Sequence, residues 1–500
     1  MAEATGVPRE REVKLQAAPG FHVPQLSGLA PEVEPGAGSE ERLETTYWDT
    51  HDLRLARWGV SLRHRGAQGW TLKLPGRVAG PLLERPELLF AGTARTVPAP
   101  AQQVLRAYVR GSQLEPVARL STWRRRVPLL GPGGRQVAEV VDDEVSVLDG
   151  RRVAARFREV EVELQDGGDH VLEPLLARLR AAGAGAPDPT PKHVRALGPS
   201  AVGPPEVADT PLSAVPRAGE VVTNALAAAV GLILRHDPGI RLGGDPEDVH
   251  QARVGTRRLR SHLRTFRPLL NGEWADALRD ELGWLADELG RVRDQEVLTE
   301  RLQGHVLRLP EVDRRSARAV VARLEAEAIV GRAELLAGLA SQRYVDLLER
   351  LVAAANRPVL DETAALPASD LLPRLVRRPW RGLRRAVRSL SAEPEDVDLH
   401  RCRIFAKRVR YAAEAVAPAV GPEAQKFAAA AAALQGVLGD HQDAAGAEVW
   451  LRAHAGVGRR AFAAGAMAAL EMGAAEAARA RWRKSWRRLD KRALRSWIPA

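Results

Sequence analysis

Seven residues near the start of the chain, Arg9–Leu15 (REREVKL), decide the fold that we expect for the first part of the protein. Successive side chains of a β-strand point to opposite faces, so Glu10, Glu12 and Lys14 project to one side. The intervening Val13 is apolar. The stretch therefore predicts a strand with one apolar face and one face that carries both signs of charge.

Five further runs alternate in a similar way between Gly, Pro and Asp turns, and we predict each of them to be a strand. They are GVSLRHR (59–65), WTLKLP (70–75), TWRRRVPLL (122–130), QVAEVVDDEVSVL (136–148) and FREVEVELQ (157–165). Helices are predicted at PAQQVLRAYVRG (100–111) and VLEPLLARLRAAGAG (171–185). The charged residues that share a parity along these strands are Arg63, Arg65, Lys73, Arg124, Arg126, Glu139, Asp143, Glu159, Glu161 and Glu163.

An antiparallel sheet closed into a barrel with a polar lumen would place all of these charges inside. Carboxylates in such a lumen would collect a hard divalent cation such as Mg²⁺ or Mn²⁺, and lysines and arginines would clamp phosphate oxygens. The alternative is an open sheet with one solvated, salt-bridged face. Asp142 and Asp143 compete for one lumen position, and the parity of Glu139 favours Asp143.

The composition divides the chain and limits its partners. The chain has 500 residues and a formal net charge of +11, which favours an anionic partner. A Pro/Gly/Ala-rich linker separates a first domain (1–200) from the rest, and we place it at 201–217. The single cysteine, Cys402, excludes an intramolecular disulfide framework. No signal segment or membrane-spanning stretch is expected, so we expect a cytoplasmic protein without a membrane partner.

Residues 218–495 change to a helical period of 3.6 and contain an internal repeat. VHQARVGTRRLRSHLR (249–264) and LHRCRIFAKRVRYAAEA (399–415) both carry a histidine followed by basic residues at offsets of 3, 7, 8 and 10. Each copy has a matching downstream element, LGRVRD (289–294) or LGDHQD (438–443). We therefore predict two similar helical bundles that arose by duplication.

The repeated helices predict a basic cleft. Offsets 0, 3, 7 and 10 fall within about 80° of the helix circumference, so each helix carries a cationic stripe beside an apolar face. Like charges so close repel unless an anion neutralises them, and arginine forks suit phosphate. A solvated basic face with intrahelical ion pairs is the simpler alternative. A nucleic-acid helix is disfavoured because the duplication indicates an enclosed cleft, and the 4% aromatic content offers few stacking platforms for single strands.

The first domain resembles the CYTH family of triphosphate tunnel metalloenzymes in its Glu-x-Glu-x-Lys motif at Glu10, Glu12 and Lys14. The resemblance extends through TTYWDTHDLRLARWGVSLRHR, WTLKLPG, LLERPEL, STWRRRV and EVEVEL. It implies an eight-stranded antiparallel tunnel that acts on triphosphates with a divalent metal. The implied metal ligands are Glu10, Glu12, Asp143, Glu159, Glu161 and Glu163. The implied triphosphate-binding residues are Lys14, Arg63, Arg65, Lys73, Arg85, Arg124 and Lys192, although Pro191 replaces the serine that usually precedes the last of these.

The second domain resembles the CHAD family of conserved-histidine α-helical domains, through DPEDVHQARVGTRRLRS, LGRVRD, LHRCRIFAKRVRYAAE and LQGVLGDHQDA. The resemblance implies binding of inorganic polyphosphate by the histidine helices, and association with polyphosphate granules. The implied binding residues are His250, Arg253, Arg257, Arg258, Arg260, Arg293, His400, Arg403, Lys407, Arg408, Arg410 and His441.

From the sequence we therefore expect an α+β multidomain enzyme, a divalent-metal-dependent triphosphatase whose catalytic residues include Glu10, Glu12 and Lys14. The alternatives are cyclisation of ATP in the same tunnel, as in class IV adenylate cyclases, and a non-catalytic module of polyphosphate granules. Tripolyphosphate, thiamine triphosphate, nucleoside triphosphates and long-chain polyphosphate all stay open as substrates, as do Mg²⁺ or Mn²⁺ as the metal and the oligomeric state.

Overall fold

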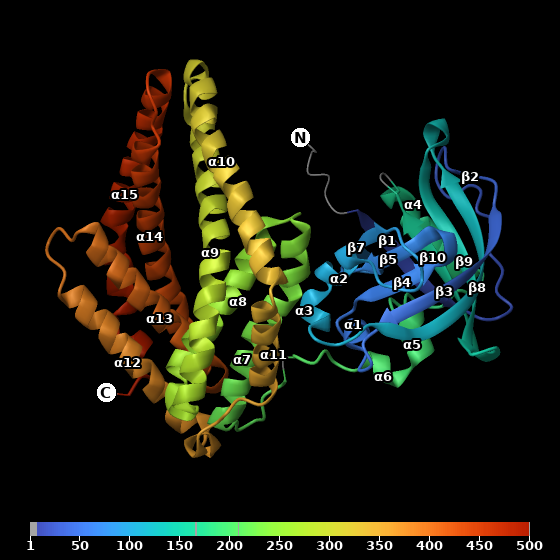
Figure 1. Cartoon of the computed structure of the whole chain (residues 1–500), viewed down its shortest axis with the longest axis horizontal. Coiled ribbons are helices and arrows are strands. Elements are labelled where there is room, and N and C mark those ends of the chain that lie inside the picture. Colours follow the sequence, from blue (N-terminus) through green and yellow to red (C-terminus); the bar gives the residue numbers. More distant parts are fainter. Residues whose placement is uncertain (1–7, 166–167, 209, 500) are drawn as a thin grey trace. The chain divides into compact units, whose positions relative to one another are not determined.

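The computed structural model describes residues 8–165, 168–208 and 210–499 (Figure 1). It divides into two compact units, 1–206 and 207–500. The division falls inside the linker expected at 201–217. The first seven residues of the expected first domain lie outside the described residues.

Eight antiparallel strands of the described residues close into a barrel in the first unit, in the order β1-β10-β9-β8-β3-β4-β5-β7 and back to β1. The barrel confirms the predicted tunnel architecture, and each of the six strands predicted from alternation is present. The strands are β1 (Arg9–Ala17), β3 (Ser39–Asp49), β4 (Ser61–Arg65), β5 (Gly69–Lys73), β7 (Leu82–Phe90), β8 (Glu115–Leu130), β9 (Gln136–Asp149) and β10 (Arg152–Leu164). The short β2 (Glu34–Pro35) pairs with β8, and β6 (Arg77–Ala79) pairs with β7.

Alternation along the strands separates the lumen from an outer apolar layer. Val13, Val160 and Val162 are fully buried and pack with Leu175 and Leu179 of α4 (Asp169–Ala181), which covers this side of the barrel. The charged residues between them face inward, because neighbours in a strand point to opposite faces. The remaining helices of this unit are α1 (Arg54–Arg57), α2 (Ala99–Val104), α3 (Arg106–Val109), α5 (Lys192–Leu197) and α6 (Pro199–Val202).

The second unit is helical, and its order of elements repeats as the sequence predicted. A run of four helices, α7 to α10, is followed by α11 and then by a second run of four, α12 to α15. The helices are α7 (Ala218–Leu242), α8 (Pro246–Thr265), α9 (Gly272–Arg308), α10 (Glu311–Ala340), α11 (Gln342–Asn356), α12 (Ala368–Arg388), α13 (Asp396–Val420), α14 (Pro422–Ala453) and α15 (Arg459–Leu489).

The two runs meet along their long hairpins and along the repeated helices. The α9–α10 and α14–α15 hairpins (Figure 1) share an apolar cluster that includes Leu302, Val321, Leu451 and Met467. The repeated helices α8 and α13 also contact one another. Gly255 of α8 permits the close approach to α7, because a Cβ there would lie 2.8 Å from the Ala229 carbonyl oxygen.

Helix α7 corrects one expectation from the sequence. By length and composition it could cross a membrane, with a mean hydropathy of 1.4 over its most apolar window, so the expectation that no stretch is apolar enough is wrong. In the structure 61% of that window is buried. Its buried Asp237 pairs with Arg241 Nε at 2.7 Å and accepts a hydrogen bond from the Tyr344 hydroxyl at 2.8 Å. These are contacts of a core helix.

Candidate functional site

The motif of β1 lies in the barrel lumen, as its parity predicted. Glu12 is 1% exposed and its carboxylate lies 2.8 Å from Lys14 Nζ and 2.8 Å from Arg85 Nη2. Burial by itself would raise the pKa of Glu12, but Lys14, followed by Lys73, outweighs it and lowers the pKa to about 2. Lys73 Nζ in turn donates to Glu10 Oε1 at 2.5 Å. The first wall of the lumen is therefore a chain of alternating charges.

Lys192 contacts the lumen carboxylates of β9 and β10, and β10 is the strand that pairs with β1. Lys192 is the first residue of α5, after an extended Pro191, and its Nζ lies 2.6 Å from Glu159, 2.9 Å from Asp143 and 3.0 Å from Glu161. Burial opposes the charge, but the three carboxylates raise the pKa of Lys192 well above its ordinary value. The lysine expected from the sequence is thus at the centre of the lumen, even though proline precedes it.

The adjacent aspartates of β9 face opposite sides of the barrel wall. Asp143 accepts two hydrogen bonds from Arg124, at 2.8 and 2.6 Å, inside the lumen. Asp142 pairs with Arg158 at 2.6 Å and with Arg125 at 3.3 Å, on the outer side. The structure therefore places Asp143 with the other lumen carboxylates.

Carboxylates crowd around Glu163 of β10. Burial, followed by the charges of Glu161 and Glu10, raises the pKa of Glu163 to about 7. Oxygen donors in such a group suit a hard divalent cation, which would relieve this repulsion. Within the described ranges, however, no group of three or more His, Cys, Asp and Glu side chains is arranged to hold a metal. Lysines and arginines contact most of these carboxylates in the structure.

Arg63 and Arg65 of β4 supply a positive region in the same lumen. Arg63 Nη2 is 3.8 Å from Glu87, and Arg65 Nε donates to the hydroxyl of Thr45 at 3.0 Å. Burial and the neighbouring Arg63 lower the pKa of Arg65 to about 10. Two close guanidinium groups with so little carboxylate contact form a place for an anion.

Two residues of the lumen were not predicted from the sequence. Tyr47 of β3 and His193 of α5 stack with their ring centroids 4.9 Å apart, and both line the central cavity. Burial, followed by the charges of Arg85 and Arg63, lowers the pKa of His193 to about 3, so its imidazole is neutral. The signals available were the parity that Tyr47 shares with Thr45 and the position of His193 beside Lys192.

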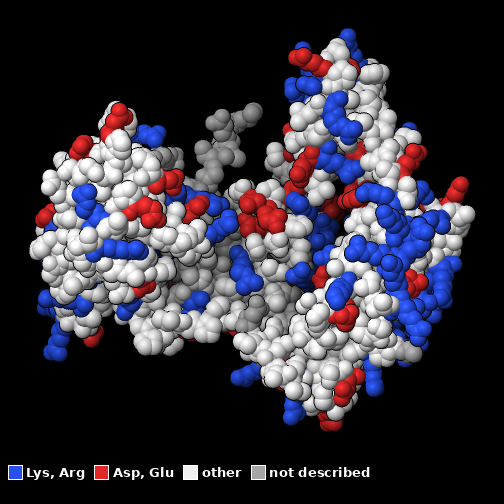
Figure 2. All heavy atoms as spheres, turned by 180° about the vertical axis from the view of Figure 1, so that it is seen from behind, with Lys and Arg blue, Asp and Glu red and all other residues white. Residues whose placement is uncertain are grey.

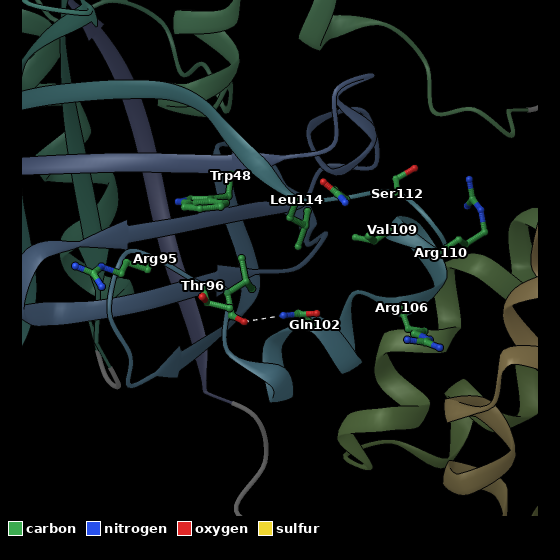
Figure 3. A pocket seen from close by; sticks show the side chains of 11 residues that line it. Trp48, Arg95, Thr96, Gln102, Arg106, Val109, Arg110, Ser112 and Leu114 are labelled. Atoms are coloured by element: carbon green, nitrogen blue, oxygen red, sulfur yellow. Dashed lines mark hydrogen bonds between the residues drawn. The ribbon is translucent and has the colours of Figure 1, made fainter.

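The central cavity is narrow, at about 30 Å³. A larger cavity of about 320 Å³ lies outside the barrel wall, between Trp48 and the short helices α2 and α3 (Figure 3). The guanidinium groups of Arg106 and Arg110 point away from Trp48 in that view, and Arg110 pairs with Glu206 at 2.6 Å. The charged groups of the barrel thus converge in the smaller cavity, and a triphosphate entering it must move side chains apart.

The repeated helices bring four predicted cations together. Arg253 and Arg257 of α8 and Arg403 and Lys407 of α13 are close enough to perturb one another, and we call them the interhelical cation cluster. Burial, followed by Arg403 and Arg257, lowers the pKa of Lys407 to about 8. Such mutual repulsion is what an anion would relieve.

The downstream elements support this cluster symmetrically. Arg253 Nη1 lies 2.8 Å from Asp294, and Arg403 Nη2 lies 3.7 Å from Asp443. A glycine in each Leu-Gly pair leaves room for the guanidinium: a Cβ at Gly290 would be 3.8 Å from Arg253 Nη2, and one at Gly439 would be 3.5 Å from Arg403 Nε. The matched spacing seen in the sequence is therefore a matched contact.

The remaining predicted residues of the helical unit have other partners. His400 Nδ1 contacts Gln442 Oε1 at 2.8 Å, and burial followed by Arg293 lowers the pKa of His250. His441 contacts Asp396 at 3.2 Å and Arg479 rather than the interhelical cation cluster. The other contacts are those of Arg258 with Glu414 (4.0 Å), Arg410 with Glu414 (2.6 Å), Arg293 with Glu296 (3.2 Å), and Arg408 with the Phe405 ring (5.1 Å). Burial, followed by the charges of Arg408, Arg279 and Arg260, lowers the pKa of Arg264.

A closed barrel with charged residues of both signs in its lumen, followed by a duplicated helical unit with paired basic helices, defines a two-domain phosphate-binding architecture. The chain belongs to the CYTH and CHAD families: the CYTH domain matches residues 8–183 and the CHAD domain matches residues 224–452.

The chain is similar to a bacterial protein of known sequence and to solved structures. The chain is 33% identical over 444 residues to an uncharacterized protein of Mycobacterium tuberculosis, with 84% of this chain and 83% of the relative covered. Among solved structures, PptA from Streptomyces chartreusis aligns with a TM-score of 0.46 and 23% identity, over 54% of this chain and 99% of PptA. The CHAD domain from the plant Ricinus communis aligns with a TM-score of 0.42 and 27% identity, over 58% and 95% of the two chains.

Proposed function

We propose that the barrel hydrolyses phosphoanhydride bonds of triphosphate or polyphosphate substrates with a divalent metal ion. The observation that carries the proposal is the lumen itself, in which buried carboxylates and buried cations neutralise one another. A triphosphate entering the lumen offers the cations a second set of anionic partners. Lys14, Arg124 and Lys192 would then release carboxylates to a cation.

The residues present fit Mg²⁺ or Mn²⁺ once this exchange of partners has occurred. Glu10, Glu12, Asp143, Glu159, Glu161 and Glu163 provide oxygen donors, and the crowding around Glu163 marks where positive charge is most favourable. A bound divalent cation polarises a phosphoryl group and lowers the pKa of a bound water.

The protein's own side chains position the chain of phosphates. The phosphates would be held by charge-assisted hydrogen bonds from four lumen cations, Arg63, Arg65, Lys73 and Arg85. The positive charges of these side chains would balance the negative charge of the leaving group. In hydrolysis a water oxygen forms a bond to the terminal phosphorus, and the bond between that phosphorus and the bridging oxygen breaks. Orthophosphate and a chain shorter by one phosphate are released.

The helical unit would bind inorganic polyphosphate at the interhelical cation cluster. Its four cations are partly buried and repel one another, so a polyanion gains both charge attraction and relief of that repulsion. The same binding would bring the protein to polyphosphate granules in the cytoplasm. Fluorescence microscopy of the tagged protein beside a granule stain tests this location.

The barrel activity is tested by a Glu10→Gln, Glu12→Gln double variant, assayed for phosphate release from tripolyphosphate with Mg²⁺ and with Mn²⁺. We expect loss of at least about 100-fold in kcat/KM, in the range seen when groups that stabilise transition-state charge are removed. An Arg9→Gln, Glu84→Gln variant also makes two substitutions, removes an exposed ion pair between β1 and β7, and is the matched control. Unchanged hydrolysis in the lumen variant would refute the proposal. Formation of cyclic AMP and pyrophosphate from ATP would replace it with the cyclase reaction.

A further inference from the structure

Two segments of the helical unit together have a larger positive net charge than the entire chain. Helix α12 contains seven arginines and one aspartate, for a net charge of +6, and residues 479–495 contain nine basic residues and one aspartate, for a net charge of +8. The whole chain has a net charge of +11. Figure 2 shows lysines and arginines gathered over one side of this unit. The rest of the chain is therefore close to neutral or slightly acidic.

The amphipathic pattern of α12 directs these arginines outward. Leu372, Val376, Trp380 and Leu383 are buried against the unit. Arginines follow one another at spacings of four and three residues on the opposite side, along about 21 Å of helix. We call the exposed arginines of α12, together with the exposed basic residues of 483–492, the α12–α15 basic face. The arginines are Arg374, Arg378, Arg381, Arg385 and Arg388.

Side-chain contacts join the two parts of this face. The rings of Trp380 in α12 and Trp486 in α15 stack with centroids 5.6 Å apart. Arg384 Nε lies 3.6 Å from Asp490, just after α15. The face is therefore one continuous surface with two basic segments side by side.

The charge of this face is not neutralised within the protein. None of the five exposed α12 arginines forms an ion pair in the part of the chain that the structure describes. They differ from the interhelical cation cluster, whose members are partly buried and belong to the duplicated helices. Helix α12 lies within the CHAD match, whereas α15 begins after residue 452, where the match ends. The α12–α15 basic face is therefore distinct from the interhelical cation cluster, and we ask separately which partner it binds.

The surroundings of the face narrow the class of partner. Within the two segments of the face, 374–388 and 483–492, no described large apolar side chain is exposed, which disfavours insertion of the face into a lipid surface. The exposed Leu366, Val397 and Met472 lie outside these segments. Trp380 and Trp482 are buried, so these rings offer no platform for the bases of a single strand. Exposed, solvated cations on two adjoining segments suit a broad, rigid polyanion, which they bind by releasing its counterions.

We propose that the α12–α15 basic face binds the phosphate backbone of duplex nucleic acid without sequence preference. The sequence argument against nucleic acid concerned the duplicated helices, whose stripes form an interhelical cluster, and does not apply to this exposed face. A single flexible polyphosphate strand would need only one of the two basic segments, whereas a duplex presents two anionic backbones. The proposal is independent of the activity proposed for the barrel.

The test measures the binding of a fluorescent 30-base-pair DNA duplex to the full chain by anisotropy, at several salt concentrations. The variant is Arg374→Glu, Arg378→Glu, Arg381→Glu. The control variant, Arg315→Glu, Arg318→Glu, Arg460→Glu, has the same net charge and changes exposed arginines elsewhere in the helical unit. We expect the first variant to lose at least about tenfold in affinity relative to the control, and its log–log salt slope to fall by about 3.

Three results would overturn the proposal: absence of salt-sensitive duplex binding by the unaltered protein, equal binding by both variants, or tighter binding of a single strand of equal length. If the first variant lost binding of long-chain polyphosphate or of anionic phosphatidylglycerol vesicles but kept duplex binding, the face would belong to that other partner. Circular dichroism checks the fold of both variants. An Arg→Gln version of the first variant replaces it if the charge reversals unfold α12.

Discussion

At the scale of single residues, the lumen depends on which of two neighbouring side chains points inward. Asp142 and Asp143 are both almost fully buried, and both bind arginine. Only Asp143 also shares Lys192 with Glu159 and Glu161. Two adjacent residues of one strand therefore have different roles: Asp143 belongs to the proposed site, and Asp142 forms ion pairs on the outer side of the barrel.

Substitutions at this pair should separate activity from stability. We expect Asp143→Asn to lower kcat/KM for tripolyphosphate by at least about 100-fold, because it removes a charge from the site. We expect Asp142→Asn to keep kcat but to lower the free energy of unfolding by about 3–5 kcal/mol, since Arg158 and Arg125 lose a buried partner. Activity at low temperature and urea unfolding curves measure the two effects. Equal losses of activity in both variants would contradict the assignment.

Lys407 should make polyphosphate binding depend on pH. Its pKa is about 8 because of burial and the neighbouring Arg403 and Arg257. The lysine is charged below this pH and neutral above it, so affinity for polyphosphate should fall as pH rises from 7 to 9. Binding at pH 8.5 should take up protons, which titration calorimetry in two buffers measures. Lys407→Arg should abolish this proton uptake.

The same group has the opposite effect on folding stability. Its pKa is lower in the folded protein than the ordinary value of 10.5, so between pH 8 and 10.5 the unfolded chain binds more protons. Stability from this group therefore rises with pH across that window. Lys407→Gln should remove this contribution, which thermal unfolding at pH 8 and pH 10 would show.

At the scale of elements, the position of the basic helices depends on how closely α8 packs against α7. A Cβ at Gly255 would lie 2.8 Å from the Ala229 carbonyl oxygen and 3.0 Å from the Leu232 side chain. An added methyl group there would push α8 away from its neighbour. It would also displace Arg253 and Arg257, which flank this turn of the helix.

We expect Gly255→Ala to destabilise the protein by about 1–3 kcal/mol through overpacking, even though alanine favours helix. The matched control is Gly304→Ala in α9, where a Cβ would have no neighbour within 4 Å. That change should stabilise the protein by about 0.5–1 kcal/mol, because glycine is a poor helix former. Urea unfolding of both variants measures these changes in the free energy of unfolding. A stabilised Gly255→Ala variant would show that α8 packs less closely against α7 than described.

The sequence predicted the strands and helices better than it predicted which side chains contact one another. Alternation located the six strands and the inward side of β9, because a period of two leaves one choice of face. Tyr47 and His193 do not belong to the pattern of alternating acidic and basic residues, and they were missed. Duplication predicted that α8 and α13 form one basic site, but His441 contacts Asp396, because packing of α14 against the start of α13 sets that contact.

At the scale of the whole molecule, the two proposed phosphate sites occupy different units and should be separable. We expect an Arg257→Glu, Lys407→Glu variant to cleave tripolyphosphate normally and to show a KM at least about tenfold higher for long-chain polyphosphate. The expected effect follows from reversing two of the four clustered charges. Steady-state phosphate release from both substrates measures it. A matched loss with tripolyphosphate would mean that the helical unit acts on the barrel reaction itself.

Closure of the barrel also sets an order of events during synthesis. Strand β1 pairs with β10, so that Lys14 lies opposite Glu161, a partner that the ribosome adds 147 residues later. One edge of the first strand can pair with β7 (Leu82–Phe90) earlier, but the edge that pairs with β10 stays open until almost the whole first unit has been translated. Pairing over such a separation is slow and leaves strand edges open to other chains. The alternating charges of REREVKL would then keep the nascent chain soluble before they meet any phosphate.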